Sequence, residues 1–117
     1  MRDPPWLFRL DHMIEFVENI EKYTKDVDRQ AFLSNRMLID AVARNFEILG
    51  EASTHIPETV KSKYPDVPWT EMRGLRIILA HNYMGADFSV LWDTSCDHLA
   101  LLKARLLEIK NVERETE

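Results

Sequence analysis

One short segment carries side chains that could act on a phosphate group. It ends at Tyr83 and contains Arg73, Arg76 and His81. An arginine holds phosphate oxygens with its planar fork of donors, and a histidine with an unperturbed pKa near 6.5 can transfer a proton at neutral pH. Such a set suits metal-free RNA cleavage, in which a 2'-hydroxyl attacks the adjacent phosphate. From spacing alone, structural roles at a helix end remain the simpler explanation.

The spacing within this segment limits how the two central residues can cooperate. On an ideal helix, His81 lies about 140° around the axis from Arg76 and about 7.5 Å along it. The two side chains therefore converge only if the arginine reaches across or the helix distorts. The apolar residues of the segment predict a buried face made of Met72, Leu75, Ile78 and Leu79.

A second polar stripe comes earlier in the chain. Its helical spacing places four residues on one face, with Asn45 beside them: Asp40, Arg44, Glu47 and Glu51. We interpret this stripe as a solvated or interface face on which Arg44 pairs with Asp40 or Glu47. Three carboxylates could also suggest a metal site, but no matching ligand set follows on a second helix. Neither a metal nor another cofactor is therefore expected.

The periodicity of apolar residues predicts helices that position both groups. The expected helical segments are 6–25, 29–33 with Asp28 as its cap, 35–54, a short segment 58–64, 69 to 81 or 83, and 87–110 capped by Asp87. The predicted buried face of the first segment is Leu10, Met13, Ile14, Val17 and Ile20, and that of the 35–54 helix is Leu38, Ala41, Val42, Ile48, Leu49 and Ala52. The fold class is all-α, an up-and-down bundle of four or five helices in a single domain, 1–117. Gly50 falls inside the 35–54 helix, and we expect a neighbouring helix to pack closely there.

Composition excludes several classes of protein. The 117 residues fit one domain, three glycines are too few for glycine-rich phosphate loops, and the lone Cys96 cannot form an internal disulfide. No apolar run is long enough to span a bilayer, and the first residues do not resemble a signal peptide, so we expect a cytoplasmic protein. The net charge of -5 argues against a general nucleic-acid coat, although residues 29–110 hold ten acidic and ten basic side chains.

The pattern Arg76-x4-His81-x-Tyr83 resembles the R-x4-H-x-Y signature of the HepT-like branch of the HEPN superfamily. Two further blocks support the resemblance in the family's order, so that it covers nearly the whole chain. They are 44–52, which reads RNFEILGEA, and 64–69, which reads YPDVPW, followed by Gly74-Leu75-Arg76.

This resemblance implies a helical homodimer in which the motifs of two subunits face one cleft. It implies a metal-independent RNase toxin that attacks RNA, including tRNA, with Arg76 and His81 as catalytic residues. It also implies a partner antitoxin, a minimal nucleotidyltransferase of the MntA type, which transfers AMP from ATP to the motif tyrosine, here Tyr83. RNA-binding or supporting roles would fall to Arg73, Arg44, Asn45 and Glu47.

The sequence departs from the family pattern directly after the motif arginine. Members usually carry a polar residue there, whereas this chain has Ile77. If that polar group positions RNA or the histidine, the activity of this copy is weakened or altered. The alternative function is therefore a noncatalytic HEPN module that docks a nucleotidyltransferase or binds a nucleotide.

Overall fold

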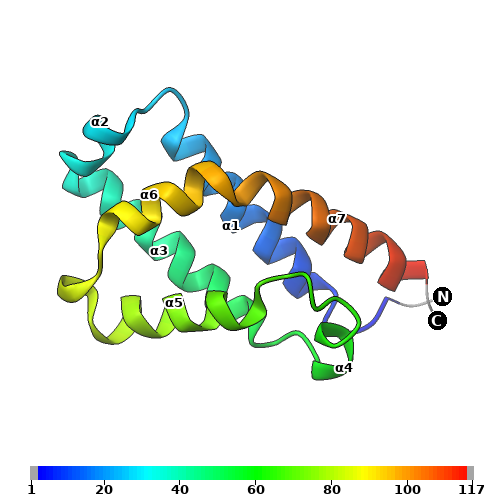
Figure 1. Cartoon of the computed structure of the whole chain (residues 1–117). Helices are drawn as coiled ribbons and strands as arrows, with labels where there is room; N and C mark the ends of the chain where they lie inside the picture. Colours follow the sequence, from blue (N-terminus) through cyan, green and yellow to red (C-terminus); the bar gives the residue numbers. More distant parts are fainter. Residues whose placement is uncertain (1–2, 116–117) are drawn as a thin grey trace.

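The computed structural model describes residues 3–115 and confirms the all-α fold class (Figure 1). The described residues form seven α-helices and one 3-10 helix. In chain order these are α1 (Phe8–Thr24), α2 (Arg29–Leu33), α3 (Arg36–Ser53), α4 (Glu58–Lys61), α5 (Trp69–His81), η1 (Tyr83–Gly85), α6 (Phe88–Asp97) and α7 (Leu99–Glu115). The long helices pack as a bundle in which α3 contacts α1 on one side and α5 on another.

Side-chain caps fix where three of these helices begin. Asp28 accepts a hydrogen bond from the Ala31 backbone N–H at 2.8 Å, and Asp87 accepts one from Ser89 at 3.0 Å. Both caps were predicted from the sequence. Asn35 caps α3 in the same way. Each cap satisfies a backbone donor that the first turn of a helix leaves without a partner.

The prediction of one last helix over 87–110 is wrong. The helix ends at Asp97, and α7 restarts at Leu99. Just before the break, the hydroxyls of Thr94 and Ser95 donate to backbone carbonyl oxygens four residues earlier, at 2.7 and 2.8 Å. Such bonds compete with the helical ladder and bend helices. The break lets α6 pack against α2 while α7 packs against α1.

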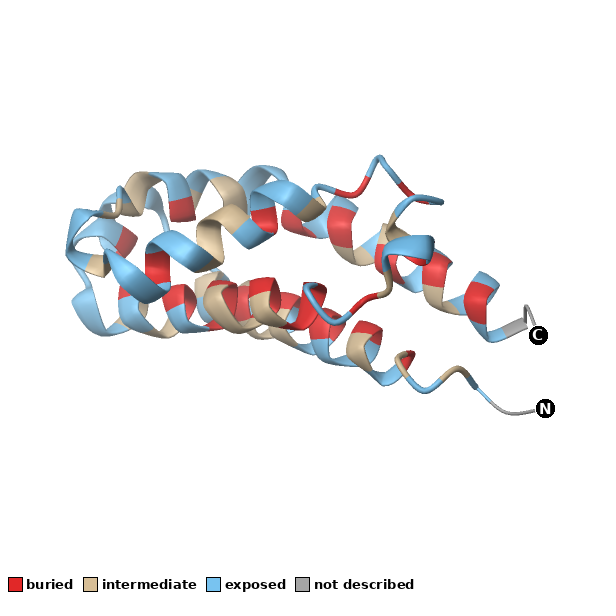
Figure 2. Ribbon diagram, turned by 90° about the horizontal axis from the view of Figure 1, so that it is seen from below, coloured by how far each residue is buried: buried red, intermediate tan, exposed pale blue. Residues whose placement is uncertain are grey.

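The core lies where the helices face one another, as Figure 2 shows. The five apolar positions expected on α1 are all buried: Leu10, Met13, Ile14, Val17 and Ile20. The expected faces of α3 and α5 are partly wrong, because Leu38, Ala41, Ile48 and Leu75 are only half-buried and Ile78 is 47% exposed. Since α3 is packed on two sides, its buried face is wider than one stripe and includes Ile39, Ala43 and Phe46. Within residues 3–115, no helix is long and apolar enough to cross a membrane.

The loop before α5 is anchored by a buried carboxylate that the sequence pattern did not reveal. Glu113 on α7 is 5% exposed and accepts a hydrogen bond from the Tyr64 hydroxyl at 2.7 Å. Lys63 supplies the compensating charge at 3.2 Å. Burial and the neighbouring carboxylate together raise the pKa of Tyr64 to about 12. This contact fixes the point from which α5 starts.

Helices α3 and α5 approach each other closely at Gly50. A Cβ atom added to Gly50 would lie 2.5 Å from the Arg76 Cβ and 2.6 Å from the Met72 carbonyl oxygen. The second neighbour is backbone, so it cannot rotate away. The expectation of close helix packing at Gly50 is therefore confirmed, and the residue packed there is the motif arginine.

We predict that Gly50→Ala destabilises the protein although alanine is the better helix former. The overlap with α5 should lower the free energy of unfolding by about 1–3 kcal/mol, which outweighs the helix-propensity gain of about 1 kcal/mol. Urea unfolding followed by circular dichroism measures the change.

The matched control is Gly74→Ala, also inside a helix, where an added Cβ meets nothing within 4 Å. This variant should gain about 0.5–1 kcal/mol. Equal stabilisation by the two substitutions would show that α3 and α5 do not approach as closely as described.

Candidate functional site

Arg76 is held where α5 crosses Gly50. Its guanidinium donates to a Glu51 carboxylate oxygen on α3 at 2.9 Å, and the other Glu51 oxygen lies 3.5 Å from His55. The Arg76 side chain is 35% exposed, so its charge is oriented by α3 while part of the guanidinium still faces solvent. An arginine presented in this way can bind an anion that approaches from outside.

His81 and Arg73 are free side chains on the same helix. Both are exposed, and neither makes a hydrogen bond or ion pair with any residue in the part of the chain that the structure describes. The helix is regular from Trp69 to His81, so the angle of about 140° between Arg76 and His81 remains. A single chain therefore presents Arg76 along α3 and His81 away from it.

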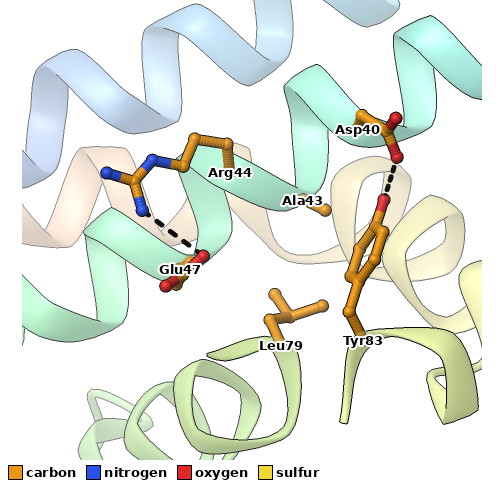
Figure 3. A pocket seen from close by; sticks show the side chains of 6 residues that line it. All are labelled: Asp40, Ala43, Arg44, Glu47, Leu79 and Tyr83. Carbon is orange, nitrogen blue, oxygen red and sulfur yellow. Dashed lines mark hydrogen bonds and ion pairs between the residues drawn. The ribbon is translucent and has the colours of Figure 1, made fainter. Parts of the chain in front are cut away.

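Tyr83 follows the end of α5, which the Asn82 N–H closes by donating to Ile78 at 2.8 Å. The chain then forms the turn η1, which directs the Tyr83 side chain back toward α3. There the hydroxyl donates a hydrogen bond to Asp40, as Figure 3 shows. The tyrosine is thus fixed to α3 by a carboxylate, as Arg76 is.

The same Asp40 oxygen accepts a second hydrogen bond, from Arg36 Nε at 2.9 Å. The Arg36 guanidinium lies 5.3 Å from the centre of the Tyr83 ring and 5.1 Å from that of Phe88. The two rings pack against each other at 5.4 Å. Tyr83 is therefore held by its hydroxyl and by the contacts of its ring with Arg36 and Phe88.

These contacts set the protonation of the pair. Burial, and next the hydrogen bond to Asp40, raise the pKa of Tyr83, and the Arg36 charge opposes this only in part. The hydrogen bonds from Tyr83 and Arg36 lower the pKa of Asp40. At neutral pH the proton therefore stays on the tyrosine, and the aspartate is an ionised acceptor.

A small pocket of about 200 Å³ lies between α3 and α5 beside this pair. Its lining residues are Asp40, Ala43, Arg44, Glu47, Leu79 and Tyr83. Arg44 and Glu47 form an ion pair across 3.4 Å, and the arginine is 67% exposed. The pocket offers a cationic and an acidic side chain on the same face as the tyrosine hydroxyl.

The amino-acid sequence of the chain matches a known protein family. The HepT-like ribonuclease family matches residues 13–109, which include every motif residue. The chain belongs to the HepT-like ribonuclease family. This confirms the resemblance found in the sequence.

Three relatives show the extent of the likeness. A candidate RNase of Methanocaldococcus jannaschii is 45% identical over 80 residues, which cover 68% of this chain and 73% of that one. A second candidate RNase of the same organism is 32% identical over 106 residues, covering 90% and 88%. A protein of Thermococcus cleftensis with the name probable ribonuclease HepT is 37% identical over 101 residues, covering 86% and 92%. No solved structure gives a significant match.

In this HepT-like protein, the ion pairs within the polar stripe of α3 differ in part from those predicted from the sequence. Arg44 pairs with Glu47, one of the two predicted partners, whereas Asp40 is taken by Arg36 and Tyr83. Among residues 3–115, no group of three or more histidine, cysteine or acidic side chains is arranged to hold a metal ion.

Asn45 lies away from the pocket. It is 8% exposed, donates to the Ala41 carbonyl oxygen at 2.9 Å and accepts from Asn19 of α1 at 3.1 Å. Its contacts join α3 to α1, which makes it a structural support for the site's helix rather than a surface that RNA could reach.

Sequence reasoning missed the long-range partners of the motif. Glu51 was noted only as part of the stripe, and Arg36 was not singled out at all. Both act on residues that are at least 25 positions distant along the chain. The one local signal was the Gly50-Glu51 pair, since a glycine inside a helix marks a close neighbour and an acidic residue beside it can meet that neighbour's charge.

Proposed function

We propose that this chain is a metal-independent endoribonuclease that acts in the cytoplasm as a homodimer and is the toxin half of a toxin–antitoxin pair. One observation carries the proposal beyond family membership: Arg76 is fixed by Glu51 at the surface, and the exposed His81 follows on the same helix with no partner among the described residues. The Arg76 guanidinium can bind a phosphate, and the His81 imidazole can transfer a proton.

In the proposed reaction, the 2'-oxygen of RNA bonds to the adjacent phosphorus and the bond to the 5'-oxygen breaks. Arg76 stabilises the extra negative charge on the phosphate oxygens, and His81 transfers a proton. The pair between Arg76 and Glu51 is partly exposed, and such pairs contribute about 1 kcal/mol or less. A phosphate can therefore share or displace the carboxylate. Arg73 and Arg44 would contact the RNA backbone, while Glu47 orients Arg44.

Arg76 and His81 point in different directions on one helix, and a homodimer would bring such side chains from two subunits together. His81 points outward between Ile77 and Ile78, which are 42% and 47% exposed. These isoleucines give the outer face of α5 apolar surface that a second copy can cover. Two motifs would then line one cleft, and Ile77, in place of the family's polar residue, would contribute to the seam.

We predict that Arg76→Ala and His81→Ala each slow cleavage of total tRNA by about 100-fold or more, as expected when a charge-stabilising or proton-transferring group is lost. Cleavage by the unaltered protein should persist in excess EDTA. Gel electrophoresis of end-labelled tRNA measures both, and Arg29→Ala and His12→Ala, changed on α2 and α1, are matched controls.

Loss of cleavage in EDTA would contradict the metal-free mechanism. The alternative, a noncatalytic module, is favoured by the occupied Arg76 guanidinium and by Ile77. It predicts that the unaltered protein leaves tRNA intact while it binds a nucleotidyltransferase.

The proposed antitoxin is an MntA-type nucleotidyltransferase that transfers AMP to Tyr83. The tyrosine hydroxyl borders the pocket and lies two residues after His81. An AMP group there would add bulk and negative charge where an RNA phosphate must approach. Steric block and like-charge repulsion would both oppose cleavage.

We predict that the chain gains the mass of AMP when incubated with Mg-ATP and an MntA-type nucleotidyltransferase. Intact-mass spectrometry should show the adduct in Tyr23→Phe, a control for an exposed tyrosine, and not in Tyr83→Phe. An adduct that persists in Tyr83→Phe would place the modification elsewhere.

A further inference from the structure

The carboxylate of Asp40 is positioned on the hydroxyl that the proposed antitoxin would modify. A single oxygen, Oδ1, accepts from both Tyr83 Oη and Arg36 Nε. The Asp40 side chain is 53% exposed, and the tyrosine is half-buried at the edge of the pocket. The hydroxyl therefore lies at a pocket that is open to solvent, from which an incoming enzyme can approach it.

A neutral phenol is a weak nucleophile, and enzymes activate such groups with an adjacent base. Burial and Asp40 raise the pKa of Tyr83, so this tyrosine ionises even less readily than a free one at neutral pH. It needs a base within hydrogen-bond distance. Asp40 is in that position and is ionised, because its own pKa is lowered by the two donors.

We propose that Asp40 is the general base for nucleotidyl transfer to Tyr83 and that Arg36 is a positioning residue that holds the carboxylate. The inference rests on the proposed function, which makes Tyr83 the acceptor. It adds that the toxin chain, rather than the transferase alone, supplies a catalytic group for its own modification.

Tyr83 Oη forms a bond to the α-phosphorus of ATP, and the bond from that phosphorus to the oxygen bridging the β-phosphorus breaks. Pyrophosphate leaves with the electron pair of the broken bond. The Oη proton moves to Asp40 Oδ1 and from there to water. Arg36 stays protonated throughout and keeps Oδ1 directed at the hydroxyl.

Among the residues that the structure describes, the charged groups that contact Tyr83 or line its pocket belong to α3. Asp40 and Arg36 contact it, and Arg44 and Glu47 line the same pocket. From α6, the neighbouring contact is the aromatic ring of Phe88. Asp40 is ionised at neutral pH and the other carboxylate of the pocket is paired with Arg44, so the contribution of Asp40 is measured by how the pH dependence changes when Asp40 is replaced.

The test compares Asp40→Asn with Asp66→Asn. Asp66 also accepts hydrogen bonds from a guanidinium, that of Arg105, and is 55% exposed, but it does not contact Tyr83. Initial rates of AMP addition are measured by intact-mass spectrometry with Mg-ATP and an MntA-type nucleotidyltransferase from pH 6 to 9. Asp66→Asn should react as the unaltered protein does.

Asp40→Asn should react about tenfold or more slowly than Asp66→Asn at pH 7. The rate of Asp40→Asn divided by the rate of Asp66→Asn should rise about tenfold per pH unit, because without the base only the ionised tyrosine reacts. Equal rates at pH 7, or a loss that does not change with pH, would overturn the role of Asp40 and leave Tyr83 as the acceptor. If the unaltered protein gains no AMP on Tyr83, the proposed modification itself fails and this inference with it.

A second measurement needs no partner. In an NMR titration of labelled tyrosine, Asp40→Asn should lower the pKa of Tyr83 relative to Asp66→Asn, because the carboxylate that stabilised the protonated phenol is gone. An unchanged pKa would show that the hydrogen bond does not form in solution, which would also overturn the proposal.

Discussion

The arrangement of the site depends on the contact between α3 and α5 at Gly50. A side chain at this position would overlap the backbone of α5, so the two helices can approach only because there is none. The contact places the Arg76 Cβ against α3, and from there the guanidinium reaches Glu51. The geometry of the motif is therefore determined as much by a residue on α3 as by the motif itself.

Two carboxylates of α3 then hold the two ends of the motif. Glu51 orients Arg76, and Asp40 orients Tyr83, while His81 between them stays free of partners among the described residues. Both carboxylates are about half-exposed, and ion pairs in such positions contribute little to stability. Their effect is on geometry and protonation.

The sequence predicted those features that depend on neighbours along the chain. The apolar pattern of α1 and the caps Asp28 and Asp87 are local, and each was confirmed. The break between α6 and α7 was not predicted because the apolar periodicity continues through it. Thr94 and Ser95, whose hydroxyls bend the helix, do not by themselves indicate a break in the sequence. The family could be identified because its motif residues lie within eight positions of one another along the chain. The partners of Arg76 and Tyr83 could not be predicted from the sequence, since these contacts depend on how α3 and α5 pack.

The most direct test of this account is the RNA cleavage rate of Gly50→Ala compared with Val60→Ala. Val60 is a buried residue of α4, so its truncation costs stability without changing the contact between α3 and α5. Both variants would be assayed at a temperature at which circular dichroism shows them folded. If the approach of the helices positions Arg76, Gly50→Ala should cut tRNA about tenfold or more slowly than Val60→Ala. Equal rates would show that the approach of α3 and α5 at Gly50 does not position Arg76 for cleavage.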